Sequence, residues 1–155
     1  MEILEYRKPL TERLVEETPV EKLRKPYVRE VLTQLRQEGY TLVTASTSPV
    51  ATSRSHLKRA ELLEFFSDTV GGDMVTRGKP NPDIFLKAAE LVNAPVEECV
   101  VVGDTPADVL AANAAGIPML LIPDQVPANE QTTALSRMIL SELREVPDAI
   151  RKLEE

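Results

Sequence analysis

Two aspartates follow an apolar run in the stretch Val100–Gly116, which reads VVVGDTPADVLAANAAG. Asp108 has a structural explanation, because Thr105 as N-cap and Pro106 in the first turn would form a capping box with it. Asp104 has no such role, and a carboxylate at the end of a buried apolar strand is costly unless it is paired or metal-bound. Both could offer oxygens to Mg²⁺, which binds few carboxylates together with water and phosphate.

Polar residues also occur at two other places in the chain. Ser46 ends the β-rich run YTLVTAS, and Thr47 and Ser48 come directly after it. Hydroxyl and backbone N–H groups there could hold phosphate oxygens. Either serine could instead cap the helix that follows. Lys79, in RGKPNPD, lies between a glycine and a proline just ahead of a helix. Its ammonium suits a phosphate, although a lone loop lysine is more often solvated surface.

The elements that would position these residues alternate between helix and strand. The sequence predicts helices over residues 27–39, 50–59, 61–65, 81–92, 106–115 and 146–155, with Asn81 as the N-cap of the fourth. It predicts strands over residues 40–46, 68–73, 98–104, 117–123 and 137–140. This alternation predicts an α/β fold with a doubly wound parallel sheet. In such sheets, ligands bind at the carboxyl ends of the strands.

Bulk composition narrows the class of protein. The 155 residues suffice for one domain with a real core. A formal charge of −7 disfavours nucleic acid and anionic membranes as partners. No apolar run reaches the ~20 residues that a bilayer requires, and the N-terminus lacks a signal-peptide pattern. The single cysteine, Cys99, fits a reducing compartment, so we expect a cytoplasmic protein.

The segment Met1–Pro26 fits the alternation less well. It is charged, and its apolar residues, among them Ile3, Leu10 and Leu14, lie loosely at helical spacing. We expect a helix and a loop on the outside of the sheet, or the tail of a domain that is mostly absent. Nothing in the segment has the pattern of a central strand. The predicted division is therefore residues 1–26 and an α/β core over residues 27–155.

The segments TLVTASTS, RGKPNPDIF and VVVGDTPADVLAANAAG resemble, in this order, motifs II, III and IV of the haloacid dehalogenase (HAD) superfamily. The resemblance runs from about Lys25 to the C-terminus and is closest to the β-phosphoglucomutase-like and phosphoglycolate-phosphatase-like branch. It implies a Rossmann-like, HAD-type core and a Mg²⁺-dependent phosphohydrolase or phosphomutase acting on a small phosphorylated metabolite. By this resemblance, Asp104 and Asp108 would position Mg²⁺, Asp104 more directly.

The resemblance also implies roles for the other polar residues. Ser46 would bind the transferring phosphoryl group, and Lys79 would stabilise its charge and that of the nucleophile. Thr47 would give a backbone N–H to the phosphoryl oxygens. Ser48 matches a residue that touches a substrate phosphate in mutase-like members.

One part of the family's pattern is missing from this sequence. In the family, an aspartate at the end of the first strand attacks phosphorus to form an aspartyl-phosphate, and a second aspartate two residues later acts as acid and base. The aspartates here stand at positions 68, 73, 83, 104, 108, 124 and 148, so there is no D-x-D pair. Residues 1–26 resemble the last part of a cap domain and its return linker. We therefore expect the chain alone to be inactive.

By the resemblance, the absent strand would leave two central sheet edges unpaired, which is an aggregation hazard. The chain could be truncated, or another polypeptide could supply the strand. Alternatively, the gap could be closed by direct strand pairing, by a segment such as EILEY, or by a second copy of the chain. A different function class also stays open: a non-catalytic HAD-like binding or regulatory module that dimerises to cover its edges.

Overall fold

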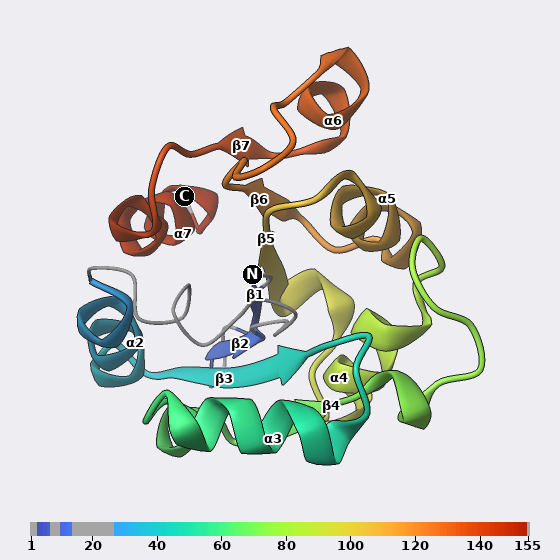
Figure 1. Cartoon of the computed structure of the whole chain (residues 1–155). Coiled ribbons are helices and arrows are strands. Elements are labelled where there is room, and N and C mark those ends of the chain that lie inside the picture. Colours follow the sequence, from blue (N-terminus) through green and yellow to red (C-terminus); the bar gives the residue numbers. More distant parts are fainter. Residues whose placement is uncertain (1–2, 7–9, 14–26, 155) are drawn as a thin grey trace.

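A seven-stranded sheet lies between helices in the computed structural model, which describes residues 3–6, 10–13 and 27–154 (Figure 1). The strands are β1 (Ile3–Tyr6), β2 (Leu10–Arg13), β3 (Tyr40–Ala45), β4 (Asp68–Val70), β5 (Cys99–Gly103), β6 (Met119–Leu121) and β7 (Met138–Ile139). The α-helices are α2 (Val28–Gln37), α3 (Val50–Arg59), α4 (Asp83–Leu91), α5 (Pro106–Ala115), α6 (Glu130–Leu135) and α7 (Val146–Leu153). Short 3₁₀ turns cover η1 (Leu63–Phe65), η2 (Gly72–Met74), η3 (Val96–Glu98) and η4 (Leu143–Glu145).

The strands from β2 onward pair in parallel, which confirms the predicted fold class. β4 pairs with β3, β2 pairs with both β3 and β5, and β6 lies between β5 and β7. Because parallel strands need crossover connections, helices separate them along the chain and cover both faces of the sheet. The carboxyl ends of β3, β4 and β5 therefore lie at one edge.

The N-terminal strands differ from the expected outer helix and loop. β1 pairs antiparallel with β3 and β5, with Leu4 opposite both Val43 and Val101, and β2 pairs with the same two strands in parallel. The expectation of a helix is wrong for these eight residues. The alternative in which EILEY closes the gap agrees with β1. The physical reason is that two open ladder edges offer backbone partners, which outweigh a weak helical periodicity.

The remainder of the predicted N-terminal unit, residues 1–2, 7–9 and 14–26, lies outside the described residues. The boundary at residue 26 stays a prediction.

Two hydrophobic layers hold the helices on the sheet. Along β3, Leu42 packs with Leu57 of α3 and with residues of α2 and α7, whereas Val43 packs with residues of α4 and α5 on the opposite face. This alternation follows from the two-residue side-chain period of a strand. Strands buried on both faces explain the continuous apolar runs in the sequence. No helix of the described part of the chain is long and apolar enough to span a membrane.

The predicted glycines at the ends of α2 and α5 are confirmed, whereas the predicted cap at Asn81 is wrong. Gly39 and Gly116 close α2 and α5 with φ of 95° and 75°, a region that favours glycine. Asn81 was expected to cap α4, but the helix begins at Asp83 after Pro82. Asn81 instead donates through both its backbone N and Nδ2 to the carbonyl of Gly78, each at 3.0 Å. This turn within the loop takes the place of a cap.

Candidate functional site

The candidate site lies at the carboxyl edge of the sheet, where three loops follow parallel strands. Ser46 follows β3, Gly71 follows β4, and Asp104 follows β5. Figure 1 shows β3 leading at this edge into the connection to α3. The residues that the sequence singled out are thus distributed over loops of the same edge, where ligands of doubly wound sheets bind.

Ser46 is fixed from two sides. Its side chain is completely buried, and its backbone N–H donates to the carbonyl of Val70 in β4 at 2.9 Å. Its Oγ accepts a hydrogen bond from the backbone N–H of Ser48 at 3.0 Å. Thr47, between them, is exposed, and Ser48 is half-buried. The loop is therefore folded around the Ser46 hydroxyl, with Thr47 at the surface of the edge.

Asp73 caps α3, and sequence reasoning missed it. The N-cap position is Pro49, which has no capping side chain, and Oδ1 of Asp73 accepts from the backbone N–H of Val50 at 2.9 Å. The interpretation that Ser46 or Ser48 caps this helix is therefore wrong. A cap supplied from a loop 23 residues away has no local signature. The only signal was the glycine pair beside it, because adjacent glycines mark a close backbone approach.

Gly71 and Gly72 allow that approach. A Cβ on Gly72 would lie 2.2 Å from the carbonyl oxygen of Thr47, and one on Gly71 would lie 2.2 Å from the backbone N of Val50. The Gly72 N–H donates to the carbonyl of Ser48 at 2.9 Å. No side chain fits between the two loops, so glycine lets the loop after β4 hold the loop after β3 directly by backbone contacts.

Lys79 and Asp108 form a buried ion pair. Lys79 Nζ lies 2.8 Å from Oδ1 of Asp108, and the two side chains are 5% and 0% exposed. Oδ2 of Asp108 accepts from the backbone N–H of Thr105, whose Oγ1 accepts from the N–H of Asp108, each at 3.2 Å. The predicted capping box is confirmed, and the same carboxylate also neutralises the lysine. With 29 positions between the two residues, no local sequence pattern predicts this pairing.

The loop that carries Lys79 is closed by a second ion pair. Arg77 binds Asp83 with two hydrogen bonds, Nη2 to Oδ1 at 2.9 Å and Nε to Oδ2 at 3.3 Å. Lys79 also lies over the ring of Phe85, with Nζ 5.8 Å from its centroid. The lysine is thus held from both sides of its loop, unlike the solvated surface lysine that was the plainer alternative.

The Arg77–Asp83 pair predicts a pH dependence. The side-chain hydrogen bond from Arg77 holds the pKa of Asp83 below its ordinary value. The pair's contribution to stability is therefore complete above the ordinary carboxyl pKa, and it is lost as the pH falls through the lowered pKa. In an Arg77→Met variant, ¹³C NMR titration of Asp83 should give a higher pKa than in the unaltered chain. An unchanged pKa would contradict the assigned cause.

The carboxylates present fit Mg²⁺ only in part. Asp104 is half-buried at the end of β5. The two oxygens of Asp108 accept hydrogen bonds from Lys79 and Thr105. Within the described residues, no group of three or more His, Cys, Asp or Glu side chains could hold a metal. Mg²⁺ nevertheless binds through one or two carboxylates when phosphate and water complete its shell. The carboxylates of this edge therefore fit a metal only in a site that phosphate and water would complete.

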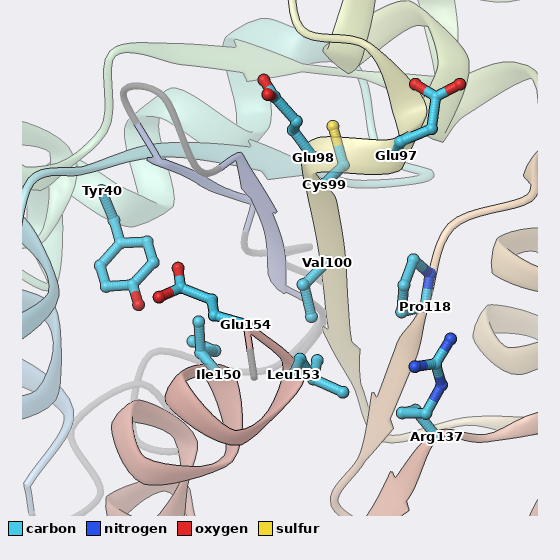
Figure 2. Close-up of a pocket in the computed structure, with 10 residues that line it drawn as sticks. All are labelled: Tyr40, Glu97, Glu98, Cys99, Val100, Pro118, Arg137, Ile150, Leu153 and Glu154. Carbon is cyan, nitrogen blue, oxygen red and sulfur yellow. The ribbon is translucent and has the colours of Figure 1, made fainter.

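A pocket of about 160 Å³ lies elsewhere, near the amino ends of β5 and β6. Figure 2 shows Cys99 and Val100 on one side of it and Ile150, Leu153 and Glu154 of the α7 region on the other. Because ligands of doubly wound sheets bind at the carboxyl edge, this pocket is not the candidate site.

Comparisons with known proteins agree with the geometry. A model of the haloacid dehalogenase-like hydrolase family matches residues 4–116. A phosphorylated carbohydrates phosphatase of Thermotoga maritima is 37% identical over 92 residues, which are 59% of this chain and 43% of that protein. A phosphoglycolate phosphatase of Nitrosospira multiformis is 35% identical over 123 residues, 79% of this chain and 54% of that protein.

The fold is also found in a solved structure. A HAD family hydrolase from Deinococcus radiodurans R1, with bound phosphate and sodium, superposes with a TM-score of 0.74 at 25% identity. The match covers 83% of this chain and 59% of that one. The chain thus spans about half the length of the relatives it resembles.

Proposed function

Because the chain belongs to the haloacid dehalogenase-like hydrolase family, we propose that its carboxyl edge binds the phosphoryl group of a small phosphorylated metabolite in a phosphohydrolase or phosphomutase reaction. The observation that carries the proposal is the buried Lys79–Asp108 pair. If the pair served only to stabilise the fold, apolar side chains of similar size would do so equally well, because burying two charges costs about as much free energy as their attraction returns. An ammonium held at a ligand-binding edge instead supports a role in balancing anionic charge.

The proposed roles follow from the contacts. The Ser46 hydroxyl and the backbone N–H of Thr47 would bind phosphoryl oxygens, with Ser48 contributing to a substrate phosphate. Lys79 would balance the charge, and Asp108 would keep its ammonium in place. Asp104 would bind Mg²⁺ directly, and Asp108 would help to position the ion less directly. When bound, the ion would neutralise charge on the phosphoryl oxygens. The metal dependence and the cytoplasmic location are parts of this proposal.

The covalent step needs a carboxylate nucleophile. In the proposed reaction an aspartate oxygen attacks phosphorus, the bond to the leaving oxygen breaks, and water later releases phosphate from the aspartyl-phosphate. No D-x-D pair occurs among the 155 residues. We therefore expect the chain by itself to bind phosphate without turning a substrate over. A non-catalytic module remains a second proposal, favoured by β1, which fills the position between β3 and β5 from within the chain.

Phosphate binding by the 155-residue chain tests the proposal. We expect inorganic phosphate, titrated in the presence of Mg²⁺ by calorimetry, to bind the chain, and Ser46→Ala to weaken binding up to about tenfold, the value of one hydrogen bond. Ser55→Ala, on the exposed side of α3, is the matched control and should bind normally. No binding, or equal weakening by both variants, would refute the proposed site.

Turnover is measured separately with p-nitrophenyl phosphate. The chain should release no phosphate beyond the uncatalysed rate. Robust Mg²⁺-dependent release would show that the expectation of inactivity is wrong while leaving the proposed reaction class in place.

A further inference from the structure

Four buried hydroxyl oxygens have no hydrogen-bond partner among the described residues. One is Ser136 Oγ, and the other three belong to β3, α3 and β4. These three are Thr44 Oγ1, Ser53 Oγ and Thr69 Oγ1, in side chains that are 0%, 0% and 2% exposed. A buried hydroxyl that makes no hydrogen bond is costly, and native proteins satisfy nearly all such groups with protein atoms or ordered water. We therefore expect a hydrogen-bond partner other than a protein atom for these three hydroxyl groups.

Thr44 and Thr69 are neighbours on one face of the sheet. They are directly paired in the parallel ladder of β3 and β4. Paired residues of adjacent strands project to the same face. Leu42, two residues before Thr44, packs in the hydrophobic layer that includes Leu57 of α3, whereas Val43 packs in the opposite layer. Both threonines therefore face the layer that contains α3.

Ser53 lies in α3 at the same height along β3 as Thr44. Figure 1 shows α3 returning alongside β3 in the opposite direction. Ser53 precedes Leu57 by one helical turn, about 6 Å along the axis, and Thr44 follows Leu42 by two residues, about 6.6 Å along the strand. Since Leu57 and Leu42 belong to one cluster, Ser53 comes to the level of Thr44. Ser53 and Leu57 are also the buried side chains of α3.

We propose that Thr44, Ser53 and Thr69 bind one buried water molecule between α3 and the β3–β4 ladder. A hydroxyl can donate and accept, and a buried water commonly makes about three hydrogen bonds. No carboxylate belongs to the three, so the neutral donor set suits water rather than a metal ion. Thr44 lies in β3 two residues before Ser46, so the water supports the strand end that precedes the Ser46 loop. The proposal does not depend on the proposed function.

The stability of hydroxyl-deleted variants tests this water site. If the hydroxyls bind water, Thr44→Val and Thr69→Val should each lower the urea midpoint, because each leaves the water and its other partners short of one hydrogen bond. The triple variant with Ser53→Ala should lose less than the sum of the single losses, because the whole network is then removed together. Thr41→Val, half-buried on the same strand, is the control and should shift the midpoint little.

Two results would overturn the water site. A higher midpoint for Thr44→Val would show that the hydroxyl was unsatisfied, since its removal relieved a cost. A high-resolution crystal structure in which the three hydroxyls bond directly to protein atoms, without an ordered water, would do the same. The expected crystal structure has one water within hydrogen-bond distance of Thr44 Oγ1, Ser53 Oγ and Thr69 Oγ1.

Discussion

Replacing Lys79 with methionine should lower the free energy of unfolding by about 3–5 kcal/mol, the usual cost of removing one partner of a buried ion pair. The variant leaves the Asp108 carboxylate completely buried without the ammonium, while the backbone N–H of Thr105 still donates to its Oδ2. The side chains are similar in length and shape, so the loss would report the missing charge rather than a cavity. Urea denaturation followed by circular dichroism measures the change.

A double variant that removes both charges distinguishes the cost of an unpaired buried charge from the other effects of the substitutions. Lys79→Met combined with Asp108→Asn should recover part of the loss, because no uncompensated charge is then buried. The matched control is Arg77→Met, two residues away, whose arginine side chain is 62% exposed in its own ion pair with Asp83. Solvent screens that pair, so the control should change little. Equal losses for Lys79→Met and Arg77→Met would contradict the assignment of a buried pair.

The Gly72→Ala substitution should destabilise the chain by about 1–3 kcal/mol, the usual cost of overpacking. The added Cβ would lie 2.2 Å from the carbonyl oxygen of Thr47, and neither backbone can move without breaking the Gly72 N–H bond to Ser48. Because this contact holds the loop between β3 and α3, we expect phosphate binding to weaken as well. Thermal unfolding and phosphate titration measure the two effects.

Gly78→Ala is the matched control for this substitution. Its Cβ would meet nothing within 4 Å, and Gly78 does not adopt a positive φ. Its stability and phosphate binding should therefore remain close to those of the unaltered chain. If Gly72→Ala behaves like Gly78→Ala, the two loops are not in the contact described.

The elements with strong periodicity were predictable from the sequence. The buried runs that became β3 and β5 are continuous because both faces of a parallel sheet are covered, and the caps Thr105 and Gly116 mark α5 by local backbone chemistry. By contrast, α6 was missed. Its residues EQTTAL show little apolar periodicity, and its cap, Asn129, gives only a short-range signal.

Contacts between segments that are distant in the chain could not be predicted from local sequence patterns. Lys79 and Asp108 are 29 residues apart, and only the folding of α5 beside the Lys79 loop brings them within 2.8 Å. Asp73 caps α3 for a similar reason, since the parallel order places β4 next to β3. No local propensity encodes either pairing.

The sequence by itself determined the types and order of the chemical groups: hydroxyls after one strand, a lysine before a helix and two aspartates after another strand. The tertiary structure decided which of them meet. It paired Asp108 with Lys79 at 2.8 Å, although the two residues stand 29 positions apart in the chain. It also placed β1 between β3 and β5, because open strand edges there supply backbone hydrogen bonds that a short charged segment cannot make alone.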